Sequence, residues 1–515
     1  MTACPLSLCC LLAVQVVPAA PGSSTVQASW PGRSGPFVTL AGSSGSVLAA
    51  GLAQESPRLP WVLSYCVELC AQSAGKAARA CLPRGEARKL ASQTGSGGRR
   101  QAGDRPFADQ PAGTDMVPQI DHFLVLMMEN HSYDNYLGML GRGPGEQPRG
   151  DGFTIGPDGK PTAANPYPDG KTQHAFRMPT TCQLSGKPSQ EWEQAHMQFN
   201  GGRNDGFVKS DSGPVAMGYW TGQDLPWSYS LAATFPLADR WFAPVLGQTQ
   251  PNRRYLLAAT SVGMVDDVAP ENLLPAPHGT IFDRLDEHHI PWRNYYSSFP
   301  PTSYLFLGDA IGDHASVVPI AQFFTDASAG NLPGFAIIDP DFGRSSGENP
   351  QNIVHAEVFA ASVVEAVMQS PAWPRTLLVW TFDEGGGYYD HVPPPAAVPP
   401  DGIPPLPPAP HYDGFARYGF RVPAVVVSAW SRPGHVTSIP HDHTSILAML
   451  ERKWNLPAMT DRDAAAADLT DFLDLNQPAF AEPPPLSPPL AGPAELRCES
   501  SGPGQIPPPG SLTPG

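Results

Sequence analysis

Two unbroken apolar runs mark the middle of the chain. Residues 123–128 read FLVLMM, and residues 376–382 read TLLVWTF. A strand without polar alternation is typical of the centre of a parallel sheet, because helices cover both of its faces and neither face meets water. Strand-like and helical stretches alternate around these runs, which predicts an α/β domain with a mainly parallel central sheet.

Other segments of the same region supply the expected neighbours of these strands. Apolar runs bounded by turn residues predict strands at 235–242, 334–338 and 423–429. Helices are expected at 190–207, 224–234, 253–260, 352–369 and 441–454, the first of them stopped by two glycines. We therefore expect one large domain over residues 116–476.

Both apolar runs end abruptly in polar residues. The first is followed by Glu129 and Asn130, and the second by Asp383 and Glu384 with three glycines after them. Ligands bind beyond the carboxyl ends of strands in open α/β sheets, and parallel strands would bring these acids to one edge. Three carboxylates repel one another unless a cation or protons intervene, so the pattern predicts a hard metal ion with oxygen ligands. The alternative is that these acids are solvated loop residues or helix caps.

Thr249 is the candidate nucleophile. It stands two residues before Pro251, and proline favours the first turn of a helix. A hydroxyl at a helix N-terminus lies where unpaired N–H groups and the helix dipole attract phosphate. The alternative is that Thr249 is an ordinary N-cap residue.

Two histidines are candidates for proton transfer. His391 follows the acidic pair Asp383 and Glu384 closely, so it could protonate a leaving alkoxide or orient another ligand. His443, next to Asp442, lies near a helix start, and helix capping is its alternative role. All 14 histidines lie between His122 and His443, which indicates that the chemistry belongs to this part of the chain.

Charge and composition narrow the function and separate the ends from the middle. The formal net charge of -16 argues against nucleic acid as the main partner. Residues 1–115 lack sustained periodicity, so we expect them to be disordered or a mis-assigned extension with a weak signal-like segment. Residues 477–515 are predicted to be a Pro-rich disordered tail. The middle has only Cys182, so it needs no disulfide and cannot make one internally.

Five short motifs carry a resemblance to a known family. ENHSYDNYLG, GQTQPNR, NPQN, DEGGGYYDHVPPP and DHTSIL occur in this order. Together they resemble the bacterial phosphoesterase family, which comprises non-zinc phospholipases C and related acid phosphatases, over residues 119–475. The resemblance implies an alkaline-phosphatase-like three-layer α/β sandwich. It also implies one divalent metal ion of unknown identity, held by Glu129, Asn130, Thr249, Asp383 and Glu384, with Thr249 in the place of the family's Ser or Thr nucleophile.

Three positions depart from the family's pattern. Family members often carry Arg at the place of His131, and many carry His at the places of Gln190 and Asn349. Amides cannot exchange a proton near neutral pH, so these departures favour a phosphodiesterase over a phosphomonoesterase.

The expected function is metal-dependent, phospholipase C-type cleavage of phosphatidylcholine-like phosphodiesters through a phospho-Thr intermediate. The alternatives are an acid phosphatase acting on phosphomonoesters and a catalytically silent lipid- or cell-surface-binding protein. We expect a phospholipid or other phosphate-ester substrate, transient contact with a membrane surface, and no nucleic acid. That substrate class favours a secreted or cell-envelope protein, although the apolar segment 6–17 is a weak signal peptide.

Overall fold

The computed structural model describes residues 100–183, 188–267, 275–298, 300, 315–490 and 506–511, together with three short strands before residue 42. The chain divides into two units, residues 1–98 and 99–515. In the first unit, β1 (Ala13–Pro18), β2 (Ser24–Ser29) and β3 (Val38–Ala41) form an antiparallel sheet in that order. The rest of this unit lies outside the described residues.

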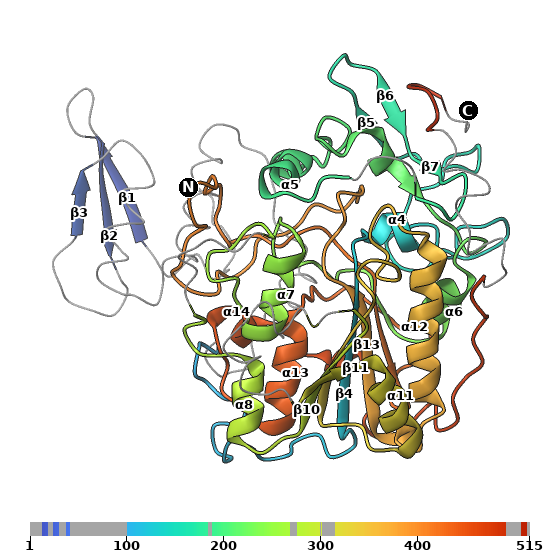
Figure 1. The fold of residues 1–515 in the computed structure, drawn as a ribbon. Helices are drawn as coiled ribbons and strands as arrows, with labels where there is room; N and C mark the ends of the chain where they lie inside the picture. The colour runs from blue at the N-terminus through green and yellow to red at the C-terminus, as the bar shows by residue number, and fades with distance from the viewer. Residues whose placement is uncertain are drawn as a thin grey trace. The chain divides into compact units, whose positions relative to one another are not determined.

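An eight-stranded sheet lies at the centre of the second unit (Figure 1), in the order β11-β10-β12-β4-β13-β14-β9-β15. The strands are β4 (His122–Met128), β9 (Leu237–Ala238), β10 (Trp292–Tyr296), β11 (Val317–Pro319), β12 (Phe335–Asp339), β13 (Thr376–Phe382), β14 (Ala424–Ser428) and β15 (Val436–Thr437). Within it, β14 runs against both of its neighbours and the other pairings are parallel. The predicted mainly parallel sheet is confirmed.

The two apolar runs form adjacent central strands. β4 pairs in parallel with β12 on one side and β13 on the other. The run 123–128 and all of β13 are buried, as a strand covered on both faces requires. Because Phe382 of β13 is in register with Met128 of β4, both strands end at the same edge of the sheet.

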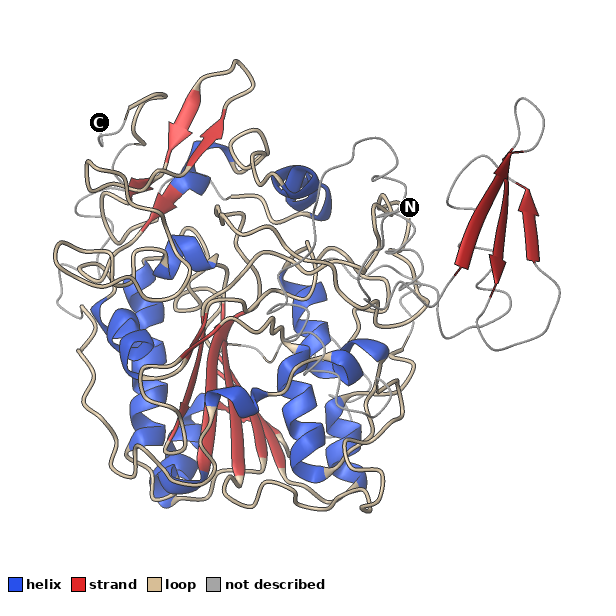
Figure 2. Ribbon diagram, turned by 180° about the vertical axis from the view of Figure 1, so that it is seen from behind, coloured by secondary structure: helices blue, strands red, loops and turns tan. Residues whose placement is uncertain are grey.

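Helices cover both faces of the sheet (Figures 1 and 2). One face carries α6 (Pro226–Thr234), α11 (Ile320–Ala329) and α12 (Ile353–Met368). The other carries α7 (Thr249–Ala258), α8 (Ile281–Glu287), α13 (Thr444–Trp454) and α14 (Asp461–Ala465). The predicted three-layer α/β sandwich is therefore confirmed. No helix among the described residues is long and apolar enough to cross a membrane.

Small elements gather over the carboxyl ends of the central strands, at the top of Figure 1. They are α4 (Tyr133–Leu137), β5 (Ala164–Pro166), β6 (Thr172–His174), β7 (Phe176–Arg177), α5 (Trp192–Phe199) and β8 (Gly218–Tyr219). Short 3-10 helices span Asn200–Gly202, Gly213–Met217, Trp373–Arg375 and Leu469–Phe472. Figure 2 shows the same upper part, rich in loops, from behind.

Some element boundaries differ from the predictions. α5 ends at Phe199, so the helix expected over 190–207 is shorter, and α7 begins at Thr249 rather than at residue 253. The strand expected over 235–242 is reduced to the two residues of β9. The sequence did not predict α8, α11, β10 and β11. The last two are the outermost strands on their side of the sheet, and β10 carries Arg293 and Asn294 among its aromatic residues.

Residues 100–115 belong to the folded second unit, so the predicted boundary at residue 116 is wrong. The Asn455 side chain, just after α13, accepts a hydrogen bond from Phe107 N at 2.9 Å and donates to the carbonyl oxygens of Phe107, Gln110 and Pro111. Arg100 forms an ion pair with Glu451 at 2.8 Å. These bonds hold a segment without regular secondary structure, which explains why no periodicity marks it in the sequence.

Residues 477–490, which were expected to be disordered, pack against the rest of the second unit. Phe480 packs on Phe235 with ring centroids 4.8 Å apart, and its carbonyl oxygen accepts a hydrogen bond from Trp373 Nε1 at 2.9 Å. Ser487 N donates to Ser230 Oγ at 3.0 Å. The prolines exclude helix and sheet here, yet one aromatic side chain and a few backbone bonds hold the segment in place.

The expectation that the middle of the chain needs no disulfide is wrong. Cys182 is disulfide-bonded. Every other cysteine of the chain lies outside the described residues.

We predict that Asn455→Ala destabilises the protein through this N-terminal segment. The substitution leaves carbonyl oxygens of residues 107, 110 and 111 without their donor and places alanine at a φ of 47°. The free energy of unfolding, measured by urea denaturation, should fall by about 2–3 kcal/mol. Asn476→Ala, at an exposed asparagine, is the control. Equal stabilities of the two variants would contradict the assigned role.

Candidate active site

The predicted acidic residues meet where β4 and β13 end. Glu129 and Asn130 follow β4, while Asp383 and Glu384 follow β13. Asp383 N donates a hydrogen bond to Met128 O at 3.1 Å, which continues the strand pairing into the site. The side chains of all four polar residues are almost fully buried.

The side-chain amide of Asn130 lies at the centre of this group. Its inner end is 2.6 Å from Asp383 Oδ1, 3.2 Å from Glu384 Oε1 and 3.2 Å from Thr249 Oγ1. A carboxylate oxygen from each acid, a hydroxyl oxygen and an amide thus converge on one point. The structure therefore brings together Asn130, Thr249, Asp383 and Glu384 from three separate parts of the chain.

The loop before α7 places Thr249. Asn252 accepts a hydrogen bond from Val245 N at 3.0 Å and donates to the carbonyl oxygens of Gly247 and Gln248, both at 2.9 Å. Gln248 occupies the N-cap position, so Thr249 is the first residue of the helix and its hydroxyl binds Asn130 instead of capping. The N-cap interpretation of Thr249 is wrong.

Arg253 is a buried residue of the site that the sequence analysis missed. Its guanidinium donates from Nε to Asp383 Oδ2 and from Nη1 to Asp339 Oδ1, each at 3.0 Å, and from Nη2 to the carbonyl oxygens of Met127 and Met128. One side chain thereby joins the ends of β4, β12 and β13. The signal was available, because Arg253 lies one helical turn after Thr249 in the motif GQTQPNR.

Burial and mutual repulsion strongly perturb the acids. Burial, followed by the negative charge of Asp383, raises the pKa of both Glu129 and Glu384 well above its ordinary value. Burial raises the pKa of Asp383 to about 6, although Arg253 acts in the opposite direction. Glu129 Oε2 is buried and has no hydrogen-bond partner among the described residues. Without a cation, these carboxyl groups therefore tend to hold protons.

The donor set fits a hard divalent cation. Carboxylate, amide and hydroxyl oxygens are the ligands that such ions prefer, and Asp383, Glu384, Asn130 and Thr249 offer them around one point. Because all of these donors are oxygens, they suit several hard cations and do not select one.

Two glycines after Glu384 allow the backbone to close around the site. Gly386 has a φ of 68°, and a Cβ on it would lie 1.8 Å from Asn130 O. Gly387 has a φ of 71°, and its Cβ would lie 2.4 Å from Ser189 O. No side chain can be accommodated at such distances, which explains the glycine run after the acidic pair.

His391 lies in an ion-pair network beside the site. Its Nδ1 is 2.7 Å from Asp134 Oδ2 and its Nε2 is 3.2 Å from Asp151 Oδ1, with 31% of the side chain exposed. Burial alone would lower the pKa of His391, but the hydrogen bond and charge of Asp134 outweigh burial and raise it. His391 is thus a partly exposed group with a proton to give.

Asp134, Asp390 and His391 are close enough to hold a cation themselves. Arg421, which is fully buried, already pairs with Asp390 Oδ1 at 2.9 Å and with Asp134 Oδ1 at 3.2 Å. The Arg421 guanidinium therefore already provides a positive charge to these two carboxylates. Within the described part of the chain, Glu129, Asp383 and Glu384 do not form a group this close, so the two acids nearest Asn130 would need its amide and the Thr249 hydroxyl to complete a cation site.

His443 lies beneath the site. Its Nε2 is 2.8 Å from Asp383 O, and its Nδ1 accepts a hydrogen bond from Trp241 Nε1 at 3.3 Å. Burial lowers its pKa to about 3, so the ring is neutral at physiological pH. The structure thus places His443 against the backbone of Asp383, with a hydrogen-bond partner at each ring nitrogen.

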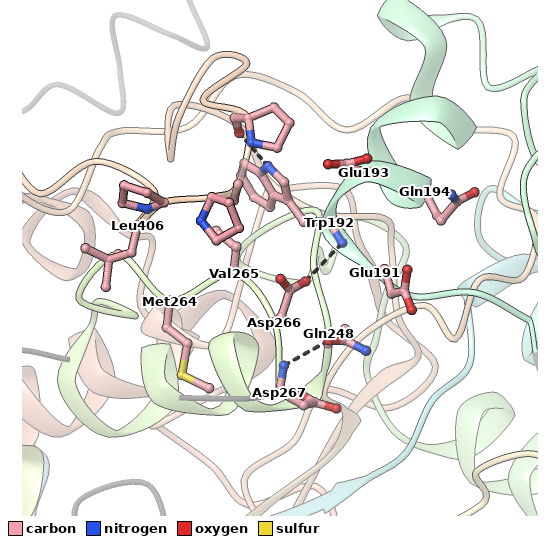
Figure 3. Close-up of a pocket in the computed structure, with 15 residues that line it drawn as sticks. Glu191, Trp192, Glu193, Gln194, Gln248, Met264, Val265, Asp266, Asp267 and Leu406 are labelled. Atoms are coloured by element: carbon pink, nitrogen blue, oxygen red, sulfur yellow. Dashed lines mark hydrogen bonds between the residues drawn. The ribbon is translucent and has the colours of Figure 1, made fainter. Parts of the chain in front are cut away.

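A cavity of about 660 Å³ opens next to the N-terminus of α7 (Figure 3), and Gln248 lines it. Its wall combines the indole of Trp192 with the carboxylates of Glu191, Glu193, Asp266 and Asp267. Asp267 also accepts a hydrogen bond from Gln250 N at 2.8 Å in the first turn of α7. An acidic, partly aromatic cavity therefore adjoins the helix turn that carries Thr249.

Sequence and structure comparisons place these features in a wider group. Non-specific phospholipase C1 of Arabidopsis thaliana is 31% identical over 392 residues, covering 69% of this chain and 71% of the relative. Phospholipase C A of Mycobacterium tuberculosis (strain ATCC 25618 / H37Rv) is 29% identical over 430 residues, covering 73% of this chain and 81% of the relative.

Among solved structures, a protein in the alkaline phosphatase superfamily from Vibrio parahaemolyticus covers 56% of this chain and 71% of its own, at 11% identity and a TM-score of 0.31. At that score the two backbones differ too much to support an argument. The sequence model of the Phosphoesterase family matches residues 120–457, which include every residue of the site. The chain therefore belongs to the Phosphoesterase family and is an enzyme that hydrolyses phosphate esters.

Proposed function

We propose that this enzyme is a metal-dependent phospholipase C that cleaves phosphatidylcholine-like phosphodiesters through a phospho-Thr249 intermediate. The observation that carries the proposal is the position of the Thr249 hydroxyl, in the first turn of α7 and in contact with the Asn130 amide beside two buried acids. The relatives named as phospholipases C from a plant and a bacterium support the same reaction class.

The residues divide the chemical work. A bound divalent cation would lower the pKa of a hydroxyl group that coordinates it, and it would offset negative charge on the phosphate. Asn130, Asp383 and Glu384 would hold it, with the unpartnered Glu129 oxygen as a further ligand. The N-terminus of α7 favours the phosphate through its dipole.

The Thr249 hydroxyl gives its proton to a water molecule, its oxygen attacks phosphorus, and the bond from phosphorus to the glycerol oxygen breaks. We propose that His391 donates a proton to the leaving glycerol oxygen, because Asp134 stabilises the charged form of His391. Water then hydrolyses the phospho-Thr249 ester and releases the phosphorylated headgroup. His443 is neutral and bonded to Asp383 O, so we assign it the positioning of that loop.

The cavity beside α7 supports a cationic headgroup. The carboxylates of Glu191, Glu193, Asp266 and Asp267 line this cavity and attract positive charge. A phosphomonoester brings a dianion without this compensating cation. The cavity therefore favours the phosphatidylcholine-like diester over the acid phosphatase alternative.

A phospholipid substrate implies a transient encounter with a lipid surface. It also favours a secreted or cell-envelope location, and we keep both as parts of the proposal.

We predict that Thr249→Ala abolishes hydrolysis of an aryl phosphocholine diester. The rate should fall by at least about a thousandfold, because no other hydroxyl replaces the nucleophile. Thr249→Ser is the matched control and should retain activity within about tenfold, since it keeps the hydroxyl. The diester and an aryl phosphate monoester are assayed side by side.

Full activity of Thr249→Ala would exclude Thr249 as the nucleophile. Rapid turnover of the monoester with none of the diester would support the acid phosphatase alternative. No turnover of either by the wild type would support the silent lipid-binding alternative.

We also predict that divalent cations bind more tightly as the pH rises. Below their raised pKa values, the buried carboxyl groups hold protons that the cation must displace, and above those values no proton has to leave. Isothermal titration with Mn²⁺ should show at least about tenfold tighter binding at about pH 8 than at about pH 5. Equal affinity at both pH values would contradict a site built from these acids.

A further inference from the structure

The side-chain amides of Asn130 and Gln190 face each other at the edge of the site. The outer end of the Asn130 amide lies 3.1 Å from Gln190 Nε2, and its inner end faces Asp383, Glu384 and Thr249. With the Asn130 oxygen turned inward, two NH₂ groups meet at the outer contact. Because neither can accept a hydrogen bond, one of the two amides has its oxygen at this contact, and the pair has two possible orientations.

The two ways of turning have different consequences. If Asn130 turns, its NH₂ group donates to Asp383, Glu384 and Thr249, and its oxygen accepts from Gln190 Nε2. This arrangement satisfies every atom without a cation. If Gln190 turns, its oxygen accepts from the Asn130 NH₂ group, and the Asn130 oxygen stays among the carboxylate oxygens. Oxygens this close are stable together only when a cation or a proton lies between them, and a cation contacts all of them at once.

The backbone keeps Gln190 at this contact. Ser189 N donates to Ser212 Oγ at 2.9 Å, and Ser189 O accepts from Gln198 Nε2 at 2.8 Å. Gly387 packs so closely on Ser189 O that its Cβ would lie 2.4 Å away. The Gln190 side chain is buried, with 6% exposed, so it can rotate its amide but cannot leave.

We propose that Gln190 is a positioning residue that selects the orientation of Asn130. When its side-chain oxygen accepts from the Asn130 NH₂ group, it directs the Asn130 oxygen to the cation. When no cation is bound, its NH₂ group donates to the reversed Asn130 amide. This inference rests on the proposed metal dependence of the enzyme.

The proposal explains how one site tolerates both states. The reversed Asn130 NH₂ group takes the place of the cation between Asp383 and Glu384 in the metal-free protein. If the side chain at residue 190 offers no hydrogen-bond partner, the cation-bound state is destabilised more than the metal-free state. In the cation-bound state, the Asn130 N–H is then buried without an acceptor. In the metal-free state, it is the Asn130 carbonyl that lacks a partner, and proteins tolerate an unpaired carbonyl better than an unpaired N–H.

The test is Mn²⁺ affinity, measured on the purified full-length protein by electron paramagnetic resonance of the free ion. Gln190→Met removes the amide at similar length, and the dissociation constant should rise about 10- to 100-fold. Gln190→His restores one acceptor nitrogen and should bind within about threefold of the wild type. Gln173→Met is the matched control, because Gln173 is fully buried and bonds to Tyr167 and His174 away from the site.

The melting temperature of each metal-free variant separates positioning from general stability. The expected result is a loss of Mn²⁺ affinity confined to Gln190→Met. Unchanged affinity in Gln190→Met, or an equal loss in Gln173→Met, would overturn the inference while leaving the proposed function intact. A wild type that binds no Mn²⁺ would remove the metal dependence itself and this inference with it. Gln190→Ala replaces Gln190→Met where the latter does not fold.

Discussion

The burial of three carboxyl groups at one edge of the sheet is the constraint on which the site depends. Glu129, Asp383 and Glu384 repel one another and have lost their hydration, so the protein must supply positive charge, protons or hydrogen-bond donors. Arg253 supplies a permanent charge to Asp383 and to Asp339 of the neighbouring strand. One Arg253 guanidinium pairs with two carboxylates, so it does not compensate the charge of Glu129 and Glu384 as well.

The same constraint accounts for the local backbone around the site. Donor groups can reach the acids only if the loops come very close, and Gly386 and Gly387 permit that approach. In the neighbouring cluster, Arg421 pairs with both Asp134 and Asp390, and one negative charge remains to stabilise the protonated form of His391. The enzyme therefore keeps two acidic clusters with different tasks. Arg421 pairs with the acids of one cluster, and we propose that the other cluster binds the cation.

The sequence predicted the parts of this design that are continuous along the chain. The central strands β4 and β13 were predictable because burial on both faces requires unbroken apolar runs, and the polar residues after them followed from strand direction. Arg253 was missed because its partners come from three strands that only the fold brings together. Residues 100–115 were missed because a single side chain, Asn455, holds them through backbone groups that any residue possesses. Thr249 was singled out by its place before Pro251 at a predicted helix start, and the family resemblance added the metal-ligand roles of Asn130 and Thr249.

The central proposal is that one cation binds beside Thr249 and not at the neighbouring cluster of Asp134, Asp390 and His391. Anomalous diffraction from crystals of the wild-type enzyme grown with Mn²⁺ tests this directly, because it locates the ion itself. The account predicts a peak in contact with oxygens of Asn130, Thr249, Asp383 and Glu384. A peak confined to Asp134, Asp390 and His391, or none at the ends of β4 and β13, would contradict it.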